Sequence, residues 1–123
     1  MAVLTTTAAK DRKRDLTAEL DRIVKILVKR YQPEKIILFG SLATNQVREW
    51  SDIDLCVVKK TELGYLDRLD EVMRLVNPNL AIDFFVYTPE EFEANLDNFF
   101  IRDEVLRQGR VLYDARGDAR AVA

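Results

Sequence analysis

The order of apolar patterns along the chain predicts an α/β or α+β fold. We expect a small mixed sheet of about three or four strands flanked by helices. Segments whose apolar residues recur every three or four positions alternate with short apolar runs. The chain has 123 residues, of which 48% are hydrophobic and 33% charged, so it can bury one small core. No repeat or flexible linker interrupts it. We therefore expect a single domain over residues 1–123, with its core at about 10–113 and a frayed tail at 114–123.

The first half of the chain is predicted to form a helix followed by two strands. Apolar residues with helical spacing indicate a helix from about Lys10 to Tyr31, which Pro33 ends. Lys35 to Phe39 is a short apolar run typical of a buried strand. Leu42 to Trp50 is polar, and we expect a short helix and a loop there. A second strand is predicted from Asp52 to Val58.

The second half repeats the alternation of helix and strand. Leu63 to Val76 has helical spacing, and Leu80 to Tyr87 is predicted to be the third strand. Thr88 is expected to be an N-cap, because proline follows it and glutamate stands three residues later. One or two short helices then end at Gly109, and Val111 to Tyr113 is expected to add a small strand.

Three aspartates within apolar runs are the main functional feature. Because strand side chains alternate between faces, Asp52 and Asp54 should share a face, and Asp83 should meet them from the adjacent strand. Taken singly, each aspartate could be a loop or edge residue. Together they need a compensating cation, and Mg²⁺ prefers such oxygen ligands. A turn at Gly40 and Ser41 offers N–H groups and a hydroxyl for phosphate, so the sequence predicts a site for a magnesium-bound nucleotide.

Composition excludes several other classes of function. The net charge of −2 makes long nucleic acid an unlikely substrate. The absence of histidine excludes Ser-His-Asp catalysis, Cys-His catalysis and histidine metal ligands. The sequence also lacks the Gly-x-x-x-x-Gly-Lys loop of P-loop ATPases, which argues against that class. The single cysteine, Cys56, is interpreted as a buried apolar residue. We expect a cytoplasmic protein without a membrane partner, because no signal peptide or long apolar span is present.

The basic residues near the N-terminus and Trp50 have no predicted chemical role. The basic residues Lys10, Arg12, Lys13 and Arg14 are predicted to lie at a solvated helix start. Trp50 is expected either at the rim of the site or packed under its loop.

The motifs resemble a known superfamily. Leu38-Phe39-Gly40-Ser41, a gap of ten residues, Ser51-Asp52-Ile53-Asp54-Leu55 and Ile82-Asp83-Phe84 are similar to the nucleotidyltransferases that include DNA polymerase beta. The short chain, the N-terminal helix and the ending Gln108-Gly109-Arg110-Val111-Leu112-Tyr113 resemble the minimal nucleotidyltransferases, MNT, which are antitoxins paired with HEPN-domain ribonuclease toxins. The resemblance covers about residues 33–113.

The resemblance implies a polymerase beta-like fold and a role for each motif. Asp52 and Asp54 would hold two Mg²⁺ ions, and Asp83 would complete the site that activates the attacking hydroxyl. Gly40 and Ser41 would bind the terminal phosphates of ATP, the nucleotide donor. The implied reaction transfers a nucleotide, with release of pyrophosphate, onto a tyrosine hydroxyl of the HEPN toxin.

Leu42 departs from the family pattern, because many members carry arginine directly after Gly-Ser. Arg48 is a candidate replacement for that cation. Two alternatives stay open: a catalytically weak or inactive antitoxin that neutralises its partner by contact, and a transferase acting on a small molecule of the aminoglycoside type. The second usually needs a further helical domain. The oligomeric state, homomeric or heteromeric, is not determined by the sequence.

Overall fold

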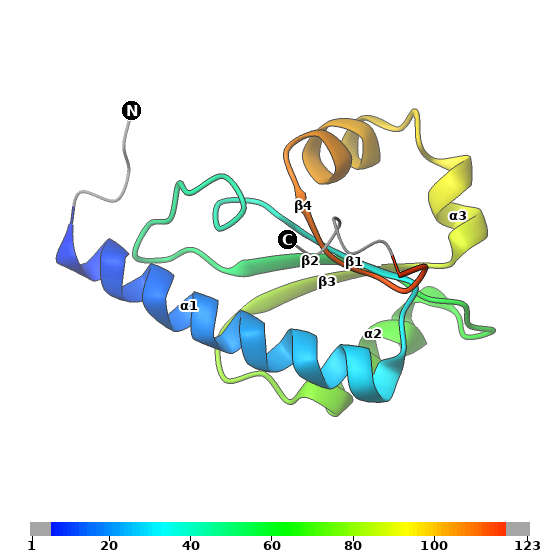
Figure 1. Ribbon diagram of the computed structural model, residues 1–123, viewed down its shortest axis with the longest axis horizontal. Coiled ribbons are helices and arrows are strands. Elements are labelled where there is room, and N and C mark those ends of the chain that lie inside the picture. Colours follow the sequence, from blue (N-terminus) through cyan, green and yellow to red (C-terminus); the bar gives the residue numbers. More distant parts are fainter. Residues whose placement is uncertain (1–5, 118–123) are drawn as a thin grey trace.

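A four-stranded mixed sheet forms the centre of the molecule in the computed structural model, which describes residues 6–117 (Figure 1). The strands are β1 (Lys35–Phe39), β2 (Ile53–Val58), β3 (Ile82–Tyr87) and β4 (Arg110–Asp114). Their order across the sheet is β3-β2-β1-β4. β1 is antiparallel to both β2 and β4, whereas β2 and β3 are parallel. The predicted fold class and mixed sheet are confirmed.

Helical segments cover both faces of this sheet (Figure 1). They are α1 (Thr7–Ile26), the π-helix η1 (Leu27–Tyr31), α2 (Tyr65–Val76), α3 (Pro89–Ala94) and the π-helix η2 (Phe100–Arg107). α1 and α2 pack on one face through a cluster that includes Leu16, Ile23 and Val72. α3 and η2 pack on the other face through Phe92 and Val105. The sheet is therefore a middle layer between two sets of helices.

Alternation along β2 assigns its side chains to these two faces. Leu55 belongs to the core under α1 and α2, whereas Cys56 belongs to the core under α3 and η2. Cys56 is fully buried, as predicted, and burial raises the pKa of its thiol to about 12. Asp54 stands two residues before Cys56, so it belongs to the η2 side of the sheet.

The connection between β1 and β2 differs from its prediction. Leu42 to Trp50 contains turns instead of a short helix, and Asn45 has a positive φ of 59°, which interrupts helical geometry. The amide of Ala43 donates to the carbonyl of Gly40 at 3.1 Å. Leu42 and Val47 are both buried in the core under α1. Tertiary packing of these two apolar side chains therefore decides the path of a segment whose composition is mostly polar.

Smaller differences concern the ends of elements. β2 and β3 begin one and two residues later than predicted, at Ile53 and Ile82. The capping box at Thr88 is confirmed, with its side chain accepting from the amide of Glu91. β4 includes Asp114, where the frayed tail was expected to begin, and residues 118–123 of that tail lie outside the described part. Within residues 6–117, no helix is both long enough and apolar enough to cross a membrane.

Candidate functional site

The turn after β1 lies directly against Asp54. Gly40 has a φ of +77°, a backbone conformation that favours glycine. A Cβ atom added to Gly40 would stand 2.1 Å from Oδ2 of Asp54, well inside contact distance. The antiparallel register pairs Phe39 with Asp54, which explains this proximity. Only glycine therefore allows the turn to approach the carboxylate so closely.

The parallel pairing of β2 and β3 places two of the three predicted carboxylates side by side. Asp54 and Asp83 are Cα partners in the register, and Asp52 precedes β2 by one residue. Their burial differs from the prediction, because Asp83 is exposed and the Asp52 side chain is 42% exposed. Asp54 is half-buried. The adjacency of Asp54 and Asp83 inferred from strand alternation is confirmed, but none of the three aspartates is fully buried.

Asp54 is electrostatically uncompensated. Its pKa is raised to about 7, first by burial, then by the negative charges of Asp83 and Asp52 and by a hydrogen bond to Asp83. Each of these causes disfavours the ionised carboxylate. A cation at this point would favour it, so the local charge of the site matches a positively charged ligand.

A cavity of about 470 Å³ opens in front of Asp54. Its lining includes Gly40, Ser41 and Thr44 from the turn, Asp54 from β2, and Glu104 from η2. This volume is within the usual range for small-molecule sites. Asp52 and Asp83 do not line it. Asp54 therefore belongs both to the cavity lined by the Gly40 turn and to the cluster of three aspartates.

The donor chemistry of the cluster fits a divalent cation. Asp52, Asp54 and Asp83 offer carboxylate oxygens, the ligands that Mg²⁺ prefers. Asp54 pairs with Asp83 in the register and lies against the Gly40 turn, so a cation there would offset the repulsion between the carboxylates. Across residues 6–117, however, no three His, Cys, Asp or Glu side chains lie gathered as a ready-made metal site. The residues fit Mg²⁺ by chemistry and adjacency, without a complete coordination shell in their present positions.

Arg12 contacts this site, although its sequence context predicted a solvated residue. Its Nε donates to the carbonyl of Ser51 at 2.9 Å, and Nη2 lies 3.8 Å from Oδ1 of Asp52. Its position on the helix could have indicated this contact, because Arg12 lies three residues after Ala9 and four before Leu16. Both of these residues are buried on α1. A charged residue on the buried stripe of a helix needs a partner.

The residues around the turn bear on the missing arginine. Leu42 is only 6% exposed and belongs to the core, so it has no polar part in the site. Arg48 lines the cavity, and its guanidinium lies 5.8 Å from the ring centroid of Trp50. Trp50 also lines the cavity and is 70% exposed, which places it at the rim.

Glu104 and Gln108 were not predicted as site residues. Both line the cavity from the region of η2. Helical spacing predicted a helix in this segment, but no pattern indicated which of its faces would meet the Gly40 turn.

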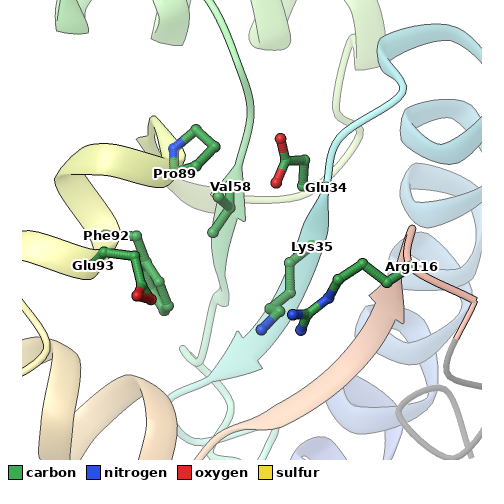
Figure 2. A pocket seen from close by; sticks show the side chains of 7 residues that line it. All are labelled: Glu34, Lys35, Val58, Pro89, Phe92, Glu93 and Arg116. Carbon is green, nitrogen blue, oxygen red and sulfur yellow. The ribbon is translucent and has the colours of Figure 1, made fainter.

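A second pocket, of about 280 Å³, lies at the opposite end of β1 and β2 (Figure 2). Lys35 and Arg116 lie on one side of it, with Phe92 and Glu93 of α3 across from them (Figure 2). Both cations have a partner in Asp114, which Arg116 contacts at 3.0 Å and Lys35 at 3.9 Å. This pocket therefore differs from the Asp54 cavity in that its two cationic side chains are paired with a carboxylate of the chain itself.

Comparison with known proteins agrees with this geometry. Residues 21–117 match the family described as "Polymerase beta, Nucleotidyltransferase". A relative from Methanocaldococcus jannaschii, named as a putative protein adenylyltransferase, is 38% identical over 80 residues, which are 65% of this chain and 78% of that protein.

Solved structures with the same fold include the following two. A putative nucleotidyltransferase from Sulfolobus solfataricus superposes with a TM-score of 0.66 at 21% identity, over 92% of this chain and 93% of the other. A toxin-antitoxin structure with AMP-PNP superposes with a TM-score of 0.55 at 20% identity, over 83% and 79%. At these identities the likeness concerns the fold.

Proposed function

Because the chain belongs to the polymerase beta nucleotidyltransferase family, we propose that it is a Mg²⁺-dependent enzyme that transfers AMP from ATP onto a tyrosine hydroxyl of a partner HEPN toxin. As such it would act as an antitoxin. The observation that supports the proposal is the close approach of the Gly40 turn to Asp54, a carboxylate whose neighbours Asp83 and Asp52 carry the same negative charge. The archaeal relative named as a protein adenylyltransferase supports a protein acceptor.

Each site residue has a role in this proposal. Gly40 and Ser41 bind the terminal phosphates through turn amides and the Ser41 hydroxyl. Asp52 and Asp54 would hold the two metal ions, and Asp83 would complete the side where the acceptor hydroxyl attacks. Bound Mg²⁺ neutralises charge on the phosphates and on the carboxylates that hold it.

The transfer itself needs positioning more than covalent chemistry by the protein. The acceptor oxygen forms a bond to the α-phosphorus, the bond from that phosphorus to the α,β-bridging oxygen breaks, and pyrophosphate leaves. The acceptor proton passes to a carboxylate or to solvent. Asp83 is exposed on β3, an edge strand of the sheet, so a side chain of another protein can reach it.

One alternative has its own support in the structure. Leu42 is buried where many family members carry arginine. This feature fits a catalytically weak antitoxin that neutralises its partner by contact alone. The cavity chemistry gives no comparable support to a small-molecule acceptor.

Mass spectrometry of the partner protein separates these functions. The protein encoded beside this chain is incubated with it, ATP and Mg²⁺, and peptides are mapped. We expect a mass gain of one AMP on a tyrosine, absent with Asp54→Asn. Binding of the partner without any mass gain would identify the contact-only antitoxin and contradict the enzyme proposal.

A further inference from the structure

Arg12 occupies a core-facing position on α1. Ala9 and Leu16, one helical turn to either side of it, are 2% and 0% exposed. The Arg12 side chain is itself only 24% exposed. Placing a guanidinium on such a stripe costs free energy unless its N–H groups are satisfied. The partners that satisfy it belong to the segment that leads into β2.

Those partners form a closed turn followed by a site aspartate. The amide of Ser51 donates to the carbonyl of Arg48 at 3.1 Å, and the amide of Arg48 donates to Oγ of Ser51 at 2.8 Å. Arg12 then binds the Ser51 carbonyl at 2.9 Å and lies 3.8 Å from the Asp52 carboxylate. One side chain of α1 therefore holds both the turn and Asp52.

Asp52 depends on this anchor because it stands outside the sheet. β2 begins at Ile53, so the ladder that fixes Asp54 does not include Asp52. Among the described residues, Arg12 supplies the ion pair of Asp52. The family match begins at residue 21, so Arg12 lies outside the segment that defines the family.

We infer that Arg12 is a positioning residue, which orients the Ser51–Asp52 segment so that the Asp52 carboxylate is presented beside Asp54. The inference rests on the proposed function and goes beyond it, by making the cation site dependent on the N-terminal helix. Arginine suits this task, because its planar fork donates to two acceptors at once, whereas a lysine ammonium is a point charge.

Positioning and simple charge predict opposite effects on cation binding. If Arg12 acted only through its positive charge, its removal would strengthen the binding of a divalent cation at Asp52. If it acts by orientation, its removal weakens that binding. Loss of an outer-shell partner of a metal ligand typically reduces metal affinity or activity about 10- to 100-fold.

The test measures Mn²⁺ affinity of the full chain without nucleotide, by titration followed by electron paramagnetic resonance, since carboxylate sites that take Mg²⁺ also accept Mn²⁺. Arg12→Ala should bind Mn²⁺ about 10- to 100-fold more weakly than the unaltered chain, and Arg12→Lys should fall between them. The kcat for transfer should fall with the affinity while the KM for ATP changes little, because the Gly40 turn is untouched.

Arg14→Ala is the matched control. Arg14 is on the same helix and is 70% exposed, and it pairs only locally with Asp11 and Asp15 within residues 6–117. Its removal changes the charge equally and should leave Mn²⁺ affinity as in the unaltered chain. Thermal unfolding is recorded for each variant, and Arg12→Lys decides the matter if Arg12→Ala does not fold.

Unchanged or tighter Mn²⁺ binding by Arg12→Ala, or by Arg12→Lys when it is the deciding variant, would overturn the inference. Failure of the proposed function looks different. In that case the unaltered chain itself neither binds Mn²⁺ nor transfers nucleotide, and the inference falls with it.

Discussion

Asp54 and Asp114 belong to the same sheet but are treated in opposite ways by the chain. Asp54 lies near the start of β2 and pairs with Phe39, at the end of β1 next to Gly40. Asp114 is the last residue of β4 and pairs with Lys35, at the other end of β1. The length of β1 separates these ends by about 13 Å. The pKa of Asp54 is raised to about 7, whereas that of Asp114 is lowered to about 2.

Their neighbours explain the difference. Asp114 accepts hydrogen bonds from the side chain and the amide of Arg116, and Lys35 adds a positive charge. Asp54 is partly buried and lies near the carboxylates of Asp83 and Asp52, which carry the same negative charge. A carboxylate that stabilises the fold is satisfied by its own chain. A carboxylate left in a cluster of like charges is stabilised by a proton or by a cationic ligand, which is why we propose the functional site at the Asp54 end.

The largest expected effect is the loss of transfer in Asp54→Asn. Removing this carboxylate should reduce nucleotide transfer by about 100- to 1,000-fold or more. The same change removes a buried, repelled charge, so the temperature of unfolding at about pH 8 should rise rather than fall. Both effects are measured on one preparation, by transfer from α-labelled ATP and by circular dichroism. Transfer at the unaltered rate would contradict the assignment.

Gly40→Ala should have the next largest effect. A methyl group at Gly40 would stand against Oδ2 of Asp54, and the φ of +77° adds strain. We expect transfer to fall about 100-fold, because displacements near 1 Å at such sites cost that much. Gly64→Ala is the control, since a Cβ there meets nothing within 4 Å. Equal activity of the two variants would argue against a close turn.

Asp114→Asn should change stability and spare activity. It loses hydrogen bonds that involve two charged groups, so the free energy of unfolding in urea should fall by about 1.5 kcal/mol or more. Nucleotide transfer should stay within about twofold, as expected for distant sites. A large loss of transfer by the folded variant would show that Asp114 also affects the Asp54 end of the sheet, and would contradict a purely structural role for Asp114.

The pH dependence of stability without added metal should differ in sign between the two aspartates. The folded-state pKa of Asp54 lies above its ordinary value of 3.8, so its contribution is present below that value and is lost as the pH rises through about 7. The pKa of Asp114 lies below 3.8, so its contribution is present above 3.8 and is lost as the pH falls toward 2.

Urea unfolding of Asp54→Asn should therefore show a flatter profile between about pH 4 and 8, and that of Asp114→Asn a flatter profile below about pH 4. Identical profiles for the two variants would contradict the assigned environments.

Local periodicity was enough to predict the sheet and the adjacency of two aspartates. Apolar runs located the strands, and alternation placed Asp54 and Asp83 on one face, because both are properties of the backbone. Their burial was not predictable, since Asp83 lies on an edge strand and its exposure depends on the order of strands.

Contacts between segments far apart in the sequence could not be predicted from local patterns either. Arg12 reaches Ser51 across 39 positions, and only the packing of α1 determines that meeting. Leu42 and Val47 are buried in a segment whose composition is mostly polar, so its turns replaced the expected helix. The contact of Asp114 with Lys35 likewise follows from how β4 pairs with β1, whereas its partner Arg116 is only two residues away in the sequence.

Thermal unfolding at about pH 8 with and without Mg²⁺, on the unaltered chain, Asp54→Asn and Asp114→Asn, tests the central claim most directly. A ligand present at 100 times its dissociation constant stabilises a fold by about 2.7 kcal/mol. We predict that Mg²⁺ raises the unfolding temperature of the unaltered chain and of Asp114→Asn by similar amounts, and leaves that of Asp54→Asn unchanged. Equal stabilisation of Asp54→Asn, or none of the unaltered chain, would contradict a cation site at Asp54.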